Sequence, residues 1–311
     1  IKLKERLRPG KMLLVDTVQG RVIDDEEIKE KYASRQPYGE WLDNNLVQLH
    51  DLKIPNQKVP MHTKEERARL QKAFGYTYED LKTSILPMAL NGSESIGAMG
   101  IDTPLAVLSN KHQPLFNYFK QLFAQVTNPP IDSIREKVVT STTVYLGTDG
   151  NVLEEKAENC KQLKINDPIL TNTDLLKIKN MKVDGFKVET IPIIYYKNTS
   201  LEKAIDHLFV EVDRAHREGA NIIILSDRGV DENHVAIPSL LAVSALQQYL
   251  VQTKKRTAMA VILESGEPRD VHHFATLLGY GASAINPYLA QESIQAVSYT
   301  HLRAHETDSY L

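Results

Sequence analysis

Acidic and basic side chains follow two of the most apolar runs in the sequence, where they could act together in chemistry. Asp227 and Arg228 follow the run 221–226, and Glu264 ends the run 258–264. If both runs are parallel strands, their carboxyl ends meet at one edge of a sheet, which is where α/β proteins bind ligands. An arginine beside two acids could bind a substrate carboxylate while an acid moves protons. An internal ion pair that closes this end of the sheet is the alternative interpretation.

A second feature is a proline-rich stop between residues 119 and 135. The apolar residues before it have the spacing of one buried helix face: Phe119, Leu122, Phe123 and Val126. This helix has to end at Asn128, because Pro129 and Pro130 lack an N–H donor and each disfavours the helical conformation in the residue before it. We name residues 127–131 the elbow. Its carbonyl groups need hydrogen-bond donors from elsewhere in the protein, from water or from a ligand, and a second helix is expected to restart near Asp132.

Cysteine and histidine offer little further chemistry. Cys160 is the only cysteine, so it can neither form an internal disulfide nor supply the thiolates of an iron–sulfur cluster, and no histidine lies near it in sequence. His272 and His273 are adjacent and therefore point about 100° apart on a helix, which predicts packing and solvent positions and no shared metal ion. The glycines between 92 and 100 lack the preceding strand of a dinucleotide fingerprint.

Composition excludes several classes of protein. The chain has 311 residues, 42% of them apolar, which fits one large domain or two smaller ones. A net charge of -3 without a dense cluster of Lys and Arg predicts no nucleic-acid partner, and 254–256 is interpreted as a charged helix end. No apolar run approaches a membrane span and no signal peptide is evident, so a cytoplasmic protein is expected. The chain begins with Ile1 and not Met, which is consistent with a piece of a longer protein.

The first half of the sequence predicts irregular, mainly helical structure. Residues 12–15 and 21–23 form a hairpin around Gly20, and a helix begins near Asp24 or Asp25. Helices are expected at 63–74 and 77–90, whereas the region 140–168 is expected to be irregular.

The second half alternates regularly between strands and helices. Strands are expected at 191–195, 221–226, 258–264 and 283–285, and helices at 201–218, 238–252 and 269–278. This order predicts a buried parallel sheet with right-handed crossovers. The fold class is therefore α/β: a rudimentary or partial TIM-like β/α barrel with a mostly parallel sheet, or an open α/β sheet, plus a less regular, α-rich N-terminal half.

Several long motifs occur in the order found in one family. They are Pro-Gly-Lys-Met-Leu-Leu-Val-Asp at 9–16, Arg-Gln-Pro-Tyr-Gly-Glu-Trp-Leu at 35–42, Met-Gly at 99–100 with Asp-Thr-Pro-Leu-Ala-Val-Leu-Ser at 102–109, the segment 119–132, Ile-Leu-Ser-Asp-Arg-Gly-Val at 224–230, and His-His-Phe-Ala at 272–275 with Leu-Gly-Tyr-Gly at 278–281. Together they resemble the large subunit of glutamate synthase over about Arg6 to Ile294.

The resemblance implies a connecting role. In that family an N-terminal amidotransferase domain releases ammonia from glutamine. A later barrel with FMN and an iron–sulfur cluster reduces the imine that ammonia forms with 2-oxoglutarate, which gives glutamate. Residues 1–41 resemble the end of the amidotransferase domain and 42–296 the central domain, which is described as a rudimentary form of the FMN barrel. The fragment alone is expected to bind no cofactor or metal and to be inactive.

The implied partners are other parts of the same enzyme. They are the amidotransferase and FMN domains of the parent chain and an electron donor, either ferredoxin or an NAD(P)H-linked small subunit. The expected location is the cytoplasm, or the plastid stroma of a photosynthetic eukaryote. Two alternatives stay open: a free-standing β/α-barrel hydrolase or lyase that uses Asp227, Arg228 and Glu264, and a non-catalytic interaction module.

Within this family the elbow becomes a candidate wall of the ammonia path. Neutral ammonia needs a water-poor channel with oxygens that accept its N–H groups. The hypothesis is that Thr127 and Asn128 offer oxygens, Pro129 and Pro130 hold the turn rigid, and Ile131 gives an apolar wall. A plain helix stop and restart is the alternative.

The last residues, 297–311, fit none of the upstream pattern and resemble translated sequencing adaptor, so they are interpreted as a non-native tail. His301 and His305 have the i, i+4 spacing of a zinc pair, but their origin in this tail argues against a metal site.

Overall fold

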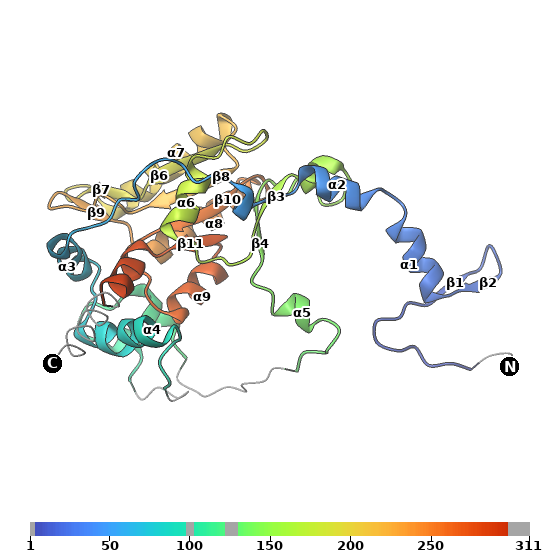
Figure 1. The fold of residues 1–311 in the computed structure, drawn as a ribbon, viewed down its shortest axis with the longest axis horizontal. Coiled ribbons are helices and arrows are strands. Elements are labelled where there is room, and N and C mark those ends of the chain that lie inside the picture. The colour runs from blue at the N-terminus through green and yellow to red at the C-terminus, as the bar shows by residue number, and fades with distance from the viewer. Residues whose placement is uncertain (1–3, 98–102, 122–129, 298–311) are drawn as a thin grey trace, which may run out of the picture.

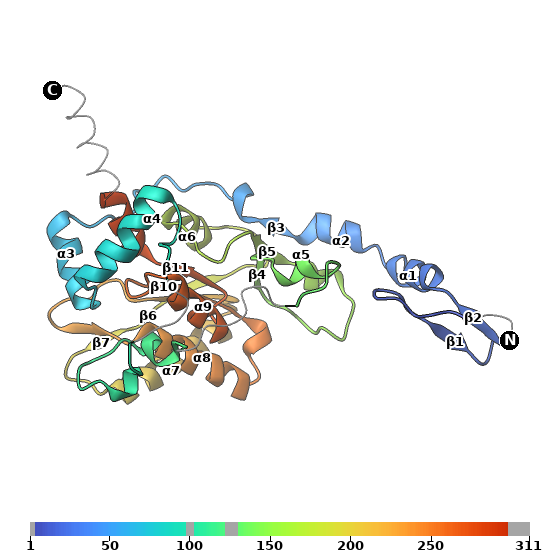
Figure 2. The ribbon, with the colours of Figure 1, turned by 90° about the horizontal axis from the view of Figure 1, so that it is seen from below.

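The computed structural model describes residues 4–97, 103–121 and 130–297. Figures 1 and 2 show an elongated molecule in which an N-terminal arm, residues 4–45, extends away from a larger body. The C-terminal part of the tail, with His301 and His305, lies outside the described residues.

The arm contains the predicted hairpin and helix. It consists of β1 (Leu14–Asp16), β2 (Arg21–Ile23), α1 (Asp25–Ala33) and α2 (Tyr38–Asn45). The strands β1 and β2 are antiparallel, with Leu14 opposite Ile23. Helix α1 begins after Asp24, whose carboxylate accepts a hydrogen bond from the backbone N–H of Glu27 at 2.8 Å. This cap satisfies one of the four N–H groups that a helix start leaves without a partner, so the prediction of hairpin and helix is confirmed.

The body is built on a four-stranded parallel sheet with the order β11-β10-β8-β6. Its strands are β6 (Val188–Pro192), β8 (Ile222–Ser226), β10 (Ala260–Glu264) and β11 (Ala284–Asn286). The crossovers contain α7 (Leu201–Arg217), α8 (Ser239–Gln252) and α9 (Val271–Gly279). The α/β class and the parallel sheet are therefore confirmed. The strand expected at 191–195 is divided at Ile193, because β6 ends there and β7 (Ile194–Tyr196) pairs instead with β9 (His234–Ala236).

The sheet approaches a barrel without closing. Outside the named strands, Ile169 forms a parallel bridge with Ile285 of β11, supported by hydrogen bonds of 2.7 and 2.8 Å. Helix α6 (Asn172–Lys179) then leads from this segment to β6 at the other edge of the sheet. Among the strands of the described residues, no pairing joins β6 to the segment around Ile169. The expectation of a barrel is thus not confirmed.

Both faces of the sheet are covered. Helices α7, α8 and α9 pack against one face through residues that include Ile223, Leu225 and Leu263. The other face, with Ile222, Ile224 and Ile262, contacts α6 and a second sheet. Because both faces are buried, the strands are continuously apolar and do not alternate with polar residues.

The second sheet corrects one expectation. Residues 140–168 are not irregular throughout, since they contain β4 (Val144–Gly147) and β5 (Gln162–Ile165), which pair antiparallel, while β3 (Val47–Gln48) pairs parallel to β5. Leu163 and Ile165 of β5 are buried, and Gln162 and Lys164 alternate with them and are half-buried. Such a short alternation is a weak signal in sequence, because only two apolar residues carry it.

The remaining elements are short helices around the two sheets and beside the arm (Figure 1). They are α3 (Lys64–Ala73), the π-helical segment η2 (Asp80–Ile85), α4 (Leu86–Asn91), α5 (Glu136–Val139) and the short 3-10 helices η1 (Leu49–Asp51), η3 (Ala106–Leu108), η4 (Leu115–Phe119), η5 (Ala157–Cys160) and η6 (Arg256–Ala258). The helix expected at 63–74 is confirmed, with a capping box between Thr63 and Glu66. The one expected at 77–90 is interrupted by the π-helical turns of η2. In the part of the chain that is described, no helix has the length and apolarity that a bilayer crossing requires.

Candidate functional site

The carboxyl ends of the parallel strands bring together the three charged residues expected there. Ser226 of β8 lies opposite Glu264 of β10, and Glu264 lies opposite Asn286 of β11. Asp227 and Arg228 follow β8 directly, so the parallel register places them beside Glu264. We name the resulting set of hydrogen-bonded side chains the strand-end network.

Glu264 is the centre of this network. Its carboxylate accepts hydrogen bonds from Lys179 Nζ at 2.7 Å, from Arg228 Nε at 2.6 Å and from Ser226 Oγ at 2.8 Å. Burial alone would raise the pKa of Glu264, but the charges of Lys179 and Arg228 lower it below its usual value. Glu264 is therefore an ionised partner of two cations, and the ion pair proposed from the sequence is confirmed.

Asp227 has a different environment. It is almost fully buried and accepts hydrogen bonds from Ser265 Oγ, from Tyr288 Oη at 2.9 Å and from the backbone N–H of Gly266 at 3.1 Å. Burial raises the pKa of Asp227 to about 7, although these three donors favour the charged form. Arg228 does not contact this carboxylate in an ion pair but lies over the ring of Tyr288, with Cζ 3.9 Å from the ring centroid.

A segment after α3 covers this end of the sheet. Tyr76 Oη donates to the carbonyl of Gly266 at 3.0 Å, and the guanidinium of Arg269 donates to the carbonyls of Phe74 and Gly75 and pairs with Asp80 at 3.0 Å. We name residues 74–80 the clasp. Arg269 is buried and its Cζ lies 4.4 Å from the centroid of the Tyr76 ring. Most polar groups of the clasp and the strand-end network are hydrogen-bonded within the protein, whereas Arg269 Nε and Asn286 Oδ1 are buried without a partner among the described residues. This dense bonding describes a structural junction better than an open catalytic centre.

Sequence reasoning missed two members of this junction, Lys179 and Tyr76, because both lie far from Asp227 in sequence and no local pattern connects them to it. Tyr288, by contrast, follows the strand expected at 283–285, so its place at this edge of the sheet could be predicted. A local sequence signal exists for helix α6, which carries Lys179. Its capping box, in which Thr171 and Asp174 bond reciprocally, has a recognisable sequence signature.

The structure describes only part of the elbow. Thr127, Asn128 and Pro129 lie outside the described residues, while Pro130 is exposed and Ile131 is half-buried. Asp132 accepts hydrogen bonds from the backbone N–H groups of Ile134 and Arg135, at 3.1 and 3.0 Å, in a turn that leads into α5.

The helix expected before the elbow does not begin at Phe119. Phe119 ends the 3-10 helix η4, and Lys120 has extended backbone with φ -68° and ψ 132°. Phe119 is also 44% exposed and contacts Tyr280 edge-on, with ring centroids 5.2 Å apart. The pattern of apolar residues misplaced this start because Phe119 reaches the end of α9 from a 3-10 turn. Residues 122–126 lie outside the described residues.

The histidine pair makes structural contacts. His273 is buried and stacks on Phe116, with ring centroids 4.2 Å apart, which confirms its packing position. His272 Nε2 lies 2.8 Å from the carbonyl oxygen of Phe116, so this residue also contacts η4 instead of only solvent. Within the described ranges, no group of three or more His, Cys, Asp or Glu side chains could hold a metal ion.

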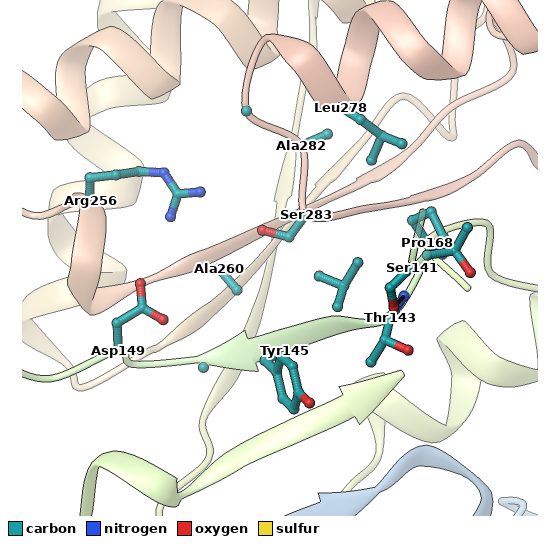
Figure 3. A pocket seen from close by; sticks show the side chains of 14 residues that line it. Ser141, Thr143, Tyr145, Asp149, Pro168, Arg256, Ala260, Leu278, Ala282 and Ser283 are labelled. Atoms are coloured by element: carbon teal, nitrogen blue, oxygen red, sulfur yellow. Dashed lines mark hydrogen bonds between the residues drawn. The ribbon is translucent and has the colours of Figure 1, made fainter. Parts of the chain in front are cut away.

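Two cavities lie at the two ends of the parallel sheet. One, of about 480 Å³, lies at the amino ends of the strands, where Figure 3 shows Arg256, Asp149 and Ser283 around it. The other, of about 680 Å³, lies at the carboxyl ends, between α3 and the loop from β8 to β9, with Tyr288 in its wall. Neither was expected from the sequence, because each is lined by segments distant along the chain.

Comparison with known proteins gives two family matches along the chain. Residues 69–310 match the model of the glutamate synthase central domain, and residues 1–41 match class-II glutamine amidotransferases.

Individual relatives agree with these matches. The glutamate synthase [NADPH] large chain of Bacillus subtilis is 46% identical over 287 residues, which cover 92% of this chain and 19% of the relative. The glutamate synthase [NADH] of Schizosaccharomyces pombe is 42% identical over 304 residues, which cover 94% of this chain and 14% of the relative. A ferredoxin-dependent glutamate synthase of Synechocystis is 40% identical over 305 residues, which cover 94% of this chain and 19% of the relative. The chain thus spans less than a fifth of the length of each of these relatives.

Proposed function

The chain belongs to the glutamate synthase central domain family, and we propose that it is the connecting segment of a full-length glutamate synthase. That enzyme is an oxidoreductase that makes two molecules of glutamate from glutamine and 2-oxoglutarate. The observation that carries the proposal is the order of the two matches on one chain, an amidotransferase end at 1–41 followed by a central domain at 69–310. The isolated chain is expected to be inactive, because the catalytic domains would lie in the four fifths of the relatives that it does not cover.

We propose a division at residue 41 and a second at residue 296. The first is supported by the arm in Figure 1, which carries the amidotransferase match and projects from the body. Residues 42–296 would be the central domain, and 297–311 a non-native tail, although the family match runs to residue 310. Sequencing the native gene beyond Gln295 tests the tail. An in-frame FMN domain supports the proposal, and a stop codon at the end of these same residues contradicts it.

The body is proposed to be a rudimentary β/α barrel. Five parallel segments support this: Ile169, β11, β10, β8 and β6 follow one another in the spatial order of a barrel, with one pairing missing. Helix α6 fills the interior face beside the missing pairing, where Leu175 and Ile178 are buried.

The elbow is proposed to line the ammonia path, through Thr127, Asn128, Pro129, Pro130 and Ile131. A contact at its exit supports this role. Ile134 Cδ1 lies 3.4 Å from the position that a Cβ on Gly10 would occupy, so the turn after the elbow approaches the arm with its amidotransferase match.

Substitution of Asn128 in the full-length native enzyme tests this path. We expect Asn128→Trp to leave glutamine hydrolysis active while less glutamate forms per glutamine hydrolysed, because released ammonia would escape to solvent. Lys137→Trp on the exposed helix α5 is the matched control and is expected to keep the two reactions coupled. Unchanged coupling in Asn128→Trp would refute the role of the elbow without affecting the family assignment.

Cofactors and electron donors are assigned to other domains of the parent enzyme. Cys160 is the only cysteine of this chain, so its residues do not fit an iron–sulfur cluster. FMN, the cluster and the contact with ferredoxin or an NAD(P)H-linked subunit are therefore proposed to lie outside it. The location is proposed to be the cytoplasm or the plastid stroma; relatives from spinach and Arabidopsis are named chloroplastic.

The alternative of a free-standing hydrolase or lyase receives no support from the comparisons. The three residues of that alternative are also hydrogen-bonded inside the strand-end network: Arg228 donates to Glu264, and Asp227 accepts from Tyr288. Assays of the purified chain for flavin fluorescence and for turnover distinguish the two. We expect neither signal, and a defined activity of the isolated chain would favour the alternative.

A further inference from the structure

The cavity at the carboxyl ends of the strands has the features of a small-molecule site. Its volume of about 680 Å³ lies within the range of known ligand sites, and it is located at the edge of the sheet where α/β proteins bind ligands. One wall is a single face of α3, which includes Arg69, and another is the loop 229–233. The cavity adjoins the strand-end network through Tyr288, which lines it and donates to Asp227.

Two exposed charged side chains in these walls form no ion pair or side-chain hydrogen bond in the described part of the chain: Arg69 of α3 and Glu232 of the loop. The charge of Arg69 is among the causes that lower the pKa of Glu66, one turn earlier on the same helix. The other acids of the walls are engaged: Glu66 accepts from the backbone N–H of Thr63 at 2.8 Å, and Asp231 accepts from the backbone N–H of His234 at 2.8 Å. The cavity therefore offers a guanidinium and a carboxylate that form no ion pair within the described residues, from two different elements.

The base of the cavity is rigid. Tyr288 is buried, and it is held by its hydrogen bond to Asp227 and by the stacked guanidinium of Arg228. His62 at the rim is held by Glu292, with Nδ1 and Oε2 2.9 Å apart. Fixed side chains reduce the entropy that a ligand would have to remove on binding.

We propose that this cavity binds a small zwitterion of the α-amino acid class. The carboxylate of the ligand pairs with Arg69, which can form two parallel hydrogen bonds, and its ammonium group pairs with Glu232. A dicarboxylate would be repelled by the carboxylates of Glu232, Asp231 and Glu66, and a diamine would be repelled by the guanidinium of Arg69. A molecule that carries both charges complements both walls and joins α3 to the loop.

Calorimetric titration of the full 311-residue chain tests this site. The probes are L-alanine and L-glutamine, with glutarate and 1,4-diaminobutane as ligands that carry only one kind of charge. We expect saturable binding of at least one amino acid, and binding of glutarate and of the diamine that is about tenfold weaker or undetectable. Arg69→Ala and Glu232→Gln should each weaken binding of the amino acid by about tenfold.

Arg67→Ala is the matched control, because it removes the same side chain from the same helix at a position that does not line the cavity. It is expected to bind the amino acid as the parent chain does, and circular dichroism of all three variants should show the parent fold. Three results would overturn the proposal: no binding of either amino acid, equal binding of glutarate or the diamine, or parent affinity in Arg69→Ala or Glu232→Gln.

Discussion

At the scale of single residues, two opposing effects set the pKa of Asp227. Its three hydrogen-bond donors favour the carboxylate, yet burial dominates and raises its pKa to about 7. In the unfolded chain the carboxyl group ionises near pH 3.8, so between about pH 4 and 7 the folded protein holds a proton that the unfolded chain has lost. Asp227 should therefore make the free energy of unfolding fall by about 2–4 kcal/mol across this interval.

Asp227→Asn tests this dependence on pH, measured by urea unfolding from pH 4 to 8. The variant has no charge to bury, so its free energy of unfolding should fall less with pH than that of the parent. Asp231→Asn is the control with opposite sign. The pKa of Asp231 is lowered, by the backbone N–H of Asn233 and by His234, so this variant should lose stability at neutral pH. Parallel curves for Asp227→Asn and the parent would contradict the buried neutral carboxyl group.

Glu264 illustrates the opposite case of a buried charge with partners. Replacement by Ala leaves the cations of Lys179 and Arg228 without an anion, at side chains that are only 27% and 21% exposed. We expect a loss of about 3 kcal/mol in the free energy of unfolding, since removing one partner of a buried pair leaves the other uncompensated. Thermal and urea unfolding would measure it, and a loss below about 0.5 kcal/mol, as at ordinary surface sites, would mean that the network has no structural role.

At the scale of elements, the contact of the clasp with the sheet depends on a glycine. A Cβ on Gly266 would lie 2.6 Å from Cε2 of Phe74, so any larger residue must displace the clasp. Gly266→Ala should cost about 1–3 kcal/mol, the range for overpacking, and should speed hydrogen exchange in residues 74–80. Gly279→Ala is the matched control, because nothing lies within 4 Å of its added Cβ and alanine favours a helix. Equal exchange in both variants would show that the clasp does not rely on this close approach.

Elements with a strong periodic pattern could be predicted from the sequence, and those defined by distant partners could not. Helix α7 was expected at 201–218 and is found at Leu201–Arg217, because its apolar face repeats over four turns. Strands β4 and β5 were missed, since four residues carry too little pattern and their pairing is set by tertiary contacts. The same distinction holds in the site. Parallel strands predicted that Asp227, Glu264 and Tyr288 would lie at one edge of the sheet, whereas Lys179 came from an element whose position only the fold determines.

At the scale of the whole molecule, the arm is the least integrated part. Its ion pairs are largely internal, as between Asp25 and both Lys11 and Lys29. It also exposes large apolar side chains, with Val18 95% and Leu13 62% accessible. Such residues projecting from an extended hairpin are expected to drive self-association, unless another part of a longer protein covers them.

Deletion of residues 1–34 tests this division of the molecule. Because β1, β2 and α1 contact mainly one another, the remaining chain should unfold cooperatively, with a free energy of unfolding within about 1 kcal/mol of the parent. Trp41 stays in the shortened chain, where its contact with Tyr38 makes it a fluorescent reporter. Sedimentation should show less self-association, and the intact chain with Leu13→Lys and Val18→Lys should show the same decrease if the apolar arm causes it. Loss of cooperative unfolding on deletion would instead show that the arm is part of the folding unit, because the body would then need its contacts to reach a stable state.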